Sequence, residues 1–223
     1  MNKKLFAEAI IKFSLGVVLL GALLFWPAGT LVWAQGWLLM GILFIPMFAA
    51  GLVMMRRSPD LLRKRLNAKE KQGEQRTVVA LSGLMFLVSF VIAGLNFRFG
   101  WIVLPGWVSI AAAVVFLIAY LLYAEVLREN AYLSRTIEVQ EGQKVIDSGL
   151  YGIVRHPMYA ATLLLFLSMP LVLGSPVSFV ISLAYPAIIA KRIRNEEQVL
   201  EAGLPGYSDY KKRVKYRLIP FIW

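Results

Sequence analysis

The chain of 223 residues contains no cysteine and a single histidine, His156. The lack of cysteine excludes disulfides, thiolate nucleophiles, iron–sulfur clusters and cysteine zinc sites, and one histidine cannot supply a two-histidine metal or haem site. Charge is also scarce, because 17% of residues are charged while 59% are hydrophobic, against roughly 45–50% apolar residues in a soluble domain. This composition predicts a polytopic membrane protein without a metal site.

Six apolar stretches predict an all-α integral membrane protein. They cover residues 13–33, 36–55, 77–95, 103–124, 158–173 and 176–190. We expect the first helix to break near Pro27. The last two are short, since 16 residues reach only about 24 Å across a hydrocarbon core of about 30 Å. We therefore expect them to form a hairpin packed partly within protein, with its turn at Gly174-Ser175-Pro176.

The charges lie almost entirely in loops on one side of this predicted topology. Of the 24 Lys and Arg residues, 23 lie outside the predicted spans on that side, and only Arg98 lies on the other side. The positive-inside rule then places both termini and the two long loops in the cytoplasm. We expect the protein to lie in the plasma membrane or an endomembrane. The net charge of +11 is thereby explained without a nucleic-acid partner. No predicted span carries a charge in its middle, which argues against a small transporter.

The chain divides into an N-terminal four-helix membrane region, residues 1–125, and a second region, residues 126–223, with a loop, the hairpin 158–190 and a cytoplasmic tail. In the first region, Ser58-Pro59-Asp60 predicts the start of a short surface helix. Its basic cluster would attract anionic membrane lipids, although the positive-inside rule alone also explains it. The cluster consists of Arg63, Lys64, Arg65, Lys69 and Lys71.

The step Arg155-His156-Pro157 stands where a polar segment becomes an apolar one. It combines a fixed charge, a hydrogen-bonding ring and a rigid backbone, which a membrane anchor does not need together. A simpler interpretation remains open: the arginine reaches the phosphates, the histidine caps a helix end and the proline begins the next helix.

After the hairpin, residues 191–200 predict a helical continuation in which Arg192 and Glu196 face the same way. Arg192 could bind an anionic head group, and Glu196 could hold a hydroxylated or cationic ligand beside it. The alternative is a salt bridge within the helix, worth only about 0.3–0.5 kcal/mol.

Several of these motifs occur together in one order. They are Gly149-Leu150-Tyr151, Arg155-His156-Pro157-Met158-Tyr159, Glu196-Glu197 with Leu200, the pair Tyr207 and Tyr210, and Arg217-Leu218-Ile219-Pro220. With them the chain resembles the isoprenylcysteine carboxyl methyltransferase family and its relatives, the phospholipid N-methyltransferases, over roughly residues 136–220. One departure is Leu204-Pro205-Gly206, where family members usually have a Phe-Gly pair.

The resemblance implies S-adenosylmethionine as the methyl donor, bound by the loop before the hairpin and by the tail. It implies cofactor contacts from Thr136, Gln143, Lys144, Val145, Ile146, Tyr151, His156, Pro157, Met158, Tyr159 and Glu196. On the acceptor side it implies a catalytic and substrate-binding role for Arg192, a second catalytic candidate in Arg217, and a substrate contact from Glu197.

We expect O-methylation of a carboxylate on a lipid or prenylated acceptor that arrives from the bilayer. A carboxylate is already ionised at neutral pH, whereas an ammonium acceptor must first lose a proton to a base. Phospholipid amine N-methylation is the alternative, with Glu197 or Glu138 as the base. A sterol reductase with a nicotinamide cofactor and a non-catalytic membrane protein are further alternatives.

Overall fold

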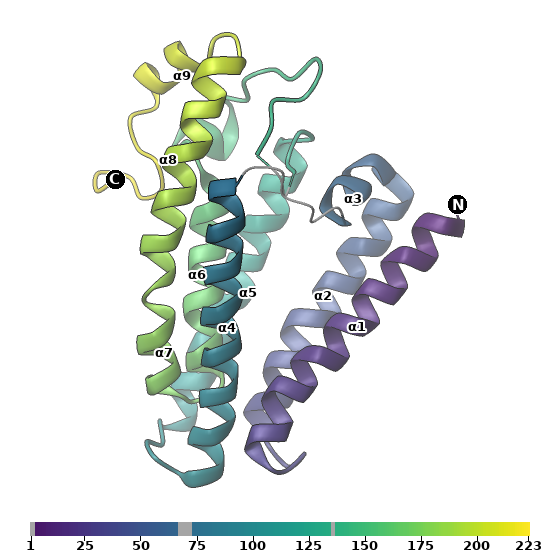
Figure 1. Ribbon diagram of the computed structural model, residues 1–223, viewed down its shortest axis with the longest axis vertical. Coiled ribbons are helices and arrows are strands. Elements are labelled where there is room, and N and C mark those ends of the chain that lie inside the picture. Colours follow the sequence, from purple (N-terminus) through teal and green to yellow (C-terminus); the bar gives the residue numbers. More distant parts are fainter. Residues whose placement is uncertain (1–2, 67–72, 135–136) are drawn as a thin grey trace.

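Figure 1 shows the computed structural model of the chain, which describes residues 3–66, 73–134 and 137–223. Lys69, Lys71 and Thr136, for which predictions were made, lie outside the described residues. Every regular element in the described ranges is helical, as expected for an all-α protein. The elements are α1 (Lys3–Ala28), α2 (Ala34–Arg57), α3 (Pro59–Leu66), α4 (Gly73–Phe99), α5 (Gly106–Glu129), the 3-10 turn η1 (Gly149–Gly152), α6 (Pro157–Val172), α7 (Pro176–Ser182), α8 (Tyr185–Gly203) and α9 (Tyr207–Arg213).

Five helical segments are long and apolar enough to cross a membrane, and the chain is an integral membrane protein. These are α1, α2, most of α4, α5, and the segment Pro176–Gly203 that contains α7 and α8. The remaining predicted span corresponds to α6, which is apolar but has only 16 residues. The first helix starts earlier than predicted, at Lys3, and ends one residue after Pro27. The predicted surface helix is α3, which begins at Pro59.

The predicted hairpin turn is confirmed in detail. Gly174 adopts a φ of 72°, a backbone conformation that favours glycine. The Ser175 hydroxyl then accepts a hydrogen bond from the Ser178 backbone N–H at 3.3 Å, and Pro176 begins α7. This is the usual combination of a serine cap and a proline in the first helical position.

The second arm of the hairpin is broken, which was not predicted, whereas its predicted helical continuation over residues 191–200 is confirmed. α7 ends at Ser182 and α8 starts at Tyr185. Pro186 has no N–H to donate to the Ser182 carbonyl, so a continuous helix would lose a hydrogen bond there. α8 then continues beyond residue 190 to Gly203, and it carries Arg192 and Glu196 out of the apolar region on one rigid element.

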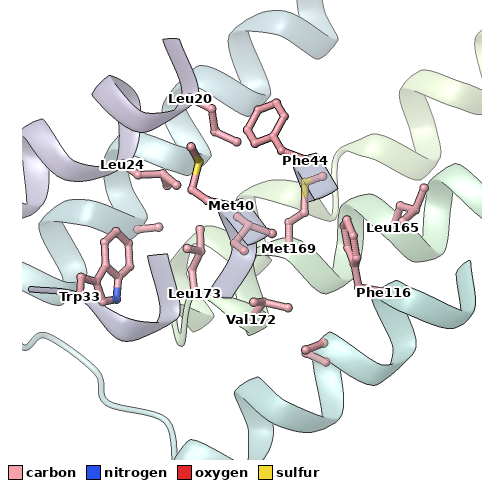
Figure 2. Packing of buried hydrophobic residues seen from close by; sticks show 14 of the residues in the cluster. Leu20, Leu24, Trp33, Met40, Phe44, Phe116, Leu165, Met169, Val172 and Leu173 are labelled. Atoms are coloured by element: carbon pink, nitrogen blue, oxygen red, sulfur yellow. The ribbon is translucent and has the colours of Figure 1, made fainter. Parts of the chain in front are cut away.

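The main apolar core joins the N-terminal helices to the hairpin. Figure 2 shows side chains from α1, α2, α5 and α6 that meet there, including Leu24, Phe116 and Val172, each with no exposed surface. A serine contact ties α4 to α7, since the Ser178 hydroxyl donates to the Ser89 carbonyl at 2.8 Å. Interhelical hydrogen bonds of this kind stabilise membrane helix packing.

The polar elements gather at one end of this bundle. In Figure 1 the start of α4, α3, α9, the end of α8 and both chain termini all lie toward the upper end. The start of α6 and the end of α5 reach the same end, so residues distant in the sequence come together there.

Gly94 in α4 allows a close approach of α1, and this contact yields a first prediction. A Cβ at this position would lie 2.7 Å from the Leu24 carbonyl oxygen and 3.0 Å from the Ala28 backbone nitrogen. Because backbone atoms cannot move aside easily, we expect Gly94→Ala to destabilise the protein by about 1–3 kcal/mol. Thermal unfolding of the detergent-purified protein measures this change.

Gly83 in the same helix is the matched control, since a Cβ there meets nothing within 4 Å. Gly83→Ala should leave the unfolding temperature unchanged or raise it, because alanine is the better helix former. Equal effects of the two substitutions would show that the α1–α4 contact does not require glycine.

Candidate functional site

A cavity lies at the polar end of the bundle, between the loop after α5, η1, the start of α6, the end of α8 and α9. The space in it that is accessible to water-sized molecules is about 100 Å³. Nine of the predicted cofactor residues line it, together with Arg192. The nine are Gln143, Lys144, Val145, Ile146, Tyr151, His156, Met158, Tyr159 and Glu196.

The Arg155-His156-Pro157 step is held by the C-terminal tail. The backbone N–H of Arg155 donates to the Tyr216 carbonyl, and that of His156 donates to the Arg217 carbonyl, both at 2.9 Å. Pro157 then begins α6, and this proline is buried and is not one of the residues that line the cavity. His156 occupies the cap position of α6, but its side chain makes no capping hydrogen bond. The simple capping role considered for His156 is therefore wrong.

Glu197 is the centre of a buried ionic cluster. Its carboxylate accepts from Arg155 Nε at 2.8 Å and from Arg217 Nε at 2.9 Å, and His156 Nε2 lies 3.2 Å away. The side chains of Arg155 and Glu197 are only 4% and 3% exposed. Arg155 also donates to two backbone carbonyls of the tail, those of Val214 and Lys215, at 2.7 Å each. The cluster thus joins α6, α8 and the tail at the cavity wall.

Two residues of this cluster, Glu197 and Arg217, were expected on the acceptor side. Glu197 and Arg217 bind each other, and neither is among the described residues that line the cavity. A carboxylate that accepts from two guanidinium groups also holds its charge, which makes it a poor proton acceptor. Glu197 and Arg217 therefore hold α8 and the tail together, and the acceptor-side roles expected of them stay predictions.

Arg192 and Glu196 are brought together through a third side chain. The Tyr159 hydroxyl donates to Glu196 Oε2 at 2.5 Å and accepts from Arg192 Nε at 2.9 Å. Arg192 Nη1 also donates to Gln75 Oε1 at 3.0 Å, across 117 positions of sequence. Sequence reasoning expected the first two residues on one helix face, and it missed Gln75.

Three buried tyrosines close the cavity on the side of η1 and α9. The Tyr210 hydroxyl donates to the Tyr151 carbonyl at 2.8 Å, and the Tyr151 hydroxyl accepts from Asn130 Nδ2 at 3.0 Å. Burial raises the pKa of Tyr151, Tyr207 and Tyr210 above the usual value, so each phenol stays neutral and can donate. Within the described residues, the buried Tyr207 hydroxyl has no hydrogen-bond partner although Tyr207 lines the cavity.

η1 itself is fixed by Glu129, another residue that sequence reasoning missed. The Leu150 backbone N–H donates to the Glu129 carboxylate, and its nitrogen lies 3.0 Å from one oxygen and 3.2 Å from the other. Gly149 has a φ of 55°, and a Cβ on it would fall 1.7 Å from the Glu129 carboxylate. The Gly-Leu-Tyr motif therefore requires Gly149 in order to position Tyr151 next to the end of α5.

Three comparisons with known proteins bear on this site. The isoprenylcysteine carboxyl methyltransferase (ICMT) family matches residues 108–202. A solved structure of the eukaryotic intramembrane Ras methyltransferase ICMT aligns with a TM-score of 0.50 at 16% identity, covering 100% of this chain and 88% of that chain. The shared fold thus extends to the N-terminal helices, for which the sequence suggested only a generic set of membrane helices.

Two curated relatives are sterol reductases. The Delta(14)-sterol reductase TM7SF2 of Mus musculus is 34% identical over 91 residues, which are 40% of this chain and 22% of the reductase. The Delta(14)-sterol reductase of Methylotuvimicrobium alcaliphilum is 26% identical over 93 residues, again 40% of this chain and 22% of the reductase. This chain spans about a fifth of the length of these relatives.

The ionic cluster predicts a large effect of Glu197 on stability. Glu197→Ala would leave the guanidinium of Arg155 buried without its carboxylate, which typically costs about 3–5 kcal/mol. We expect a strongly lowered unfolding temperature in detergent. Glu201→Ala is the control on the same helix: Glu201 pairs with Lys211 at 2.7 Å with side chains 37% and 34% exposed, and such pairs contribute about 0–1 kcal/mol. Similar losses in the two variants would contradict the assigned role.

Proposed function

We propose that this chain, whose residues 108–202 match the isoprenylcysteine carboxyl methyltransferase family, methylates the carboxylate of a prenylated or similarly lipid-like acceptor. S-adenosylmethionine is the proposed donor, and the cytoplasmic face of the membrane is the proposed location. The observation that carries the proposal is the cavity, which is lined mostly by residues of the matched region and presents a cation, Arg192, and an anion, Glu196, on either side of one tyrosine hydroxyl.

The residues of the cavity suit the proposed donor. S-adenosylmethionine carries an amino acid group, ribose hydroxyls, an adenine ring and a positive sulfonium whose methyl group is the one transferred. Glu196 can accept from amino or hydroxyl groups, and Lys144 offers a charge for the carboxylate of the donor. The unpartnered hydroxyl of Tyr207 provides a further donor, and neutral tyrosine rings attract a cation.

On the acceptor side, Arg192 is the residue that matters most. Its guanidinium can hold a carboxylate through two parallel hydrogen bonds, which fixes both position and direction. Alignment of this kind can supply several kcal/mol of the barrier to a direct displacement. The carboxylate is ionised at neutral pH, so the chain needs no base for this reaction.

The surroundings of Arg192 fit an acceptor that is polar at one end only. An apolar cluster formed by α4, α6 and α8 lies directly below the polar residues, and it includes Met85, Tyr185 and Ile189. The apolar part of an acceptor can stay among lipid-facing helices while its head group reaches the cavity.

The similarity to sterol reductases supports a second candidate function, the reduction of a lipid with a nicotinamide cofactor. The cavity is lined by cations, Lys144 and Arg192, as well as by Glu196, and the family match over residues 108–202 favours methyl transfer. Amine methylation is also less well supported, since the ion-paired Glu197 cannot act as a base. Glu138 is the base candidate that remains at the cavity.

Donor binding is the first property to measure. We expect the detergent-purified protein to bind S-adenosylhomocysteine in calorimetric titration, and Glu196→Ala to weaken binding by about 10- to 100-fold through the loss of charge-assisted hydrogen bonds. Glu201→Ala, one turn further along α8, should bind as the wild type does. Binding of a nicotinamide cofactor in place of S-adenosylhomocysteine would support the reductase instead.

Arg192 is expected to act on the acceptor and not on the donor. Arg192→Ala should lower methylation of N-acetyl-S-farnesylcysteine by at least about 100-fold, while the dissociation constant for S-adenosylhomocysteine stays within about threefold. Arg192→Lys should not restore full activity, because lysine lacks the planar fork. Arg194 is exposed on the same helix and provides the control. Normal turnover by Arg192→Ala would remove this residue from the mechanism.

A further inference from the structure

Gln75 has a buried side-chain amide, of which only the oxygen makes a hydrogen bond in the described part of the chain. It is 1% exposed, and its Oε1 accepts from Arg192 Nη1 at 3.0 Å. In the described part of the chain its Nε2 has no hydrogen-bond partner. Buried amide N–H groups are almost always paired, since leaving one unpaired is unfavourable. A donor in this position is suited to an acceptor oxygen of a ligand.

Gln75 is not itself among the described residues that line the cavity, but it makes a hydrogen bond to Arg192, which is. It lies in the first turns of α4, outside the region that matches the family, and α4 packs on both α6 and α8. Figure 1 shows this end of α4 beside α8. Its hydrogen-bond partner, Arg192, lines the cavity.

The contact with Arg192 fixes which way the amide faces. The guanidinium has only donors, so it must bind the oxygen of Gln75 and not the nitrogen. Because Oε1 and Nε2 share one carbon atom, the free N–H₂ group stands beside the guanidinium. Two kinds of donor, one charged and one neutral, therefore lie side by side at this point.

We infer that Gln75 is an acceptor-binding residue that donates from Nε2 to the acceptor carboxylate beside Arg192. The inference rests on the proposed function and adds a basis for its selectivity. A carboxylate has two oxygens and can accept from both residues at once, whereas an ammonium group offers only N–H donors of its own. The pair thus favours a carboxylate acceptor over the amine head of a phospholipid.

Three variants test this role. Gln75→Met keeps the approximate size of the side chain and removes the donor, and it should raise the KM for N-acetyl-S-farnesylcysteine about tenfold or more. Gln75→Glu keeps an oxygen for Arg192 but lacks the N–H₂ group, so it should also raise the KM. If Gln75 served only to orient Arg192, the glutamate variant would keep the KM of the wild type, and the inference would be overturned.

Asn96→Leu is the matched control, because Asn96 is a buried amide in the same helix whose groups are both used. Its Nδ2 donates to the Ile102 carbonyl at 2.9 Å, and its Oδ1 accepts from the Ile102 N–H at 3.3 Å. This variant should leave the KM unchanged. Binding of S-adenosylhomocysteine with wild-type affinity confirms that each variant is folded.

The outcomes separate this inference from the proposed function. A wild-type protein that methylates the farnesylcysteine, with a Gln75→Met variant whose KM is within twofold, overturns the role of Gln75 alone. A wild-type protein that methylates phosphatidylethanolamine in vesicles of that lipid and phosphatidylcholine, but not the farnesylcysteine, overturns both. Raised KM values in both Gln75 variants, with unchanged donor affinity, support the inference.

Discussion

The site depends on one carboxylate, Glu197, which is shared by cations from two other segments. Arg155 comes from the start of the hairpin and Arg217 from the tail, and both reach the same side chain on α8. A buried charge is tolerated only when it is paired and hydrogen-bonded, and here every partner belongs to an element of the cavity wall. Together with the backbone hydrogen bonds of Arg155 and His156 to the tail, the arrangement fixes the relative positions of His156, Glu196 and the tail.

Around this cluster the polar residues are divided between two tasks. Glu197, Arg155 and Arg217 neutralise one another within the wall, whereas Arg192 and Glu196 face the cavity. Adjacent glutamates thus have different roles because consecutive positions on a helix point about 100° apart.

Much of the fold followed from the sequence, because its signals are local. The end of α1 after Pro27, the turn at Gly174 and the start of α6 at Pro157 each result from the backbone properties of one or two residues. The break before Tyr185 is also caused by a proline, but the apolar composition on both sides of Pro186 concealed it.

The site was less predictable because its decisive contacts are distant in sequence. The resemblance indicated which residues surround the cavity, and most of them line it. It could not indicate that Glu197 forms an ion pair with Arg155, 42 residues away in the sequence. It also could not indicate that Gln75 forms a hydrogen bond with Arg192, 117 residues away. Periodicity reports the face of a helix, and it contains no information about the helix that packs against that face.

The shortness of α6 has a consequence for how deep the cavity lies. A helix of 16 residues is about 24 Å long, while the hydrocarbon core is about 30 Å thick. The helix begins directly at the cavity wall, so a bilayer of this thickness that reaches the far end of α6 would also reach the level of the cavity. Withdrawing an acyl or prenyl chain into water costs about 0.8 kcal/mol for each CH₂ group. Under the proposed function, a cavity at this level avoids this cost, because the acceptor would not have to rise out of the bilayer to meet the polar donor.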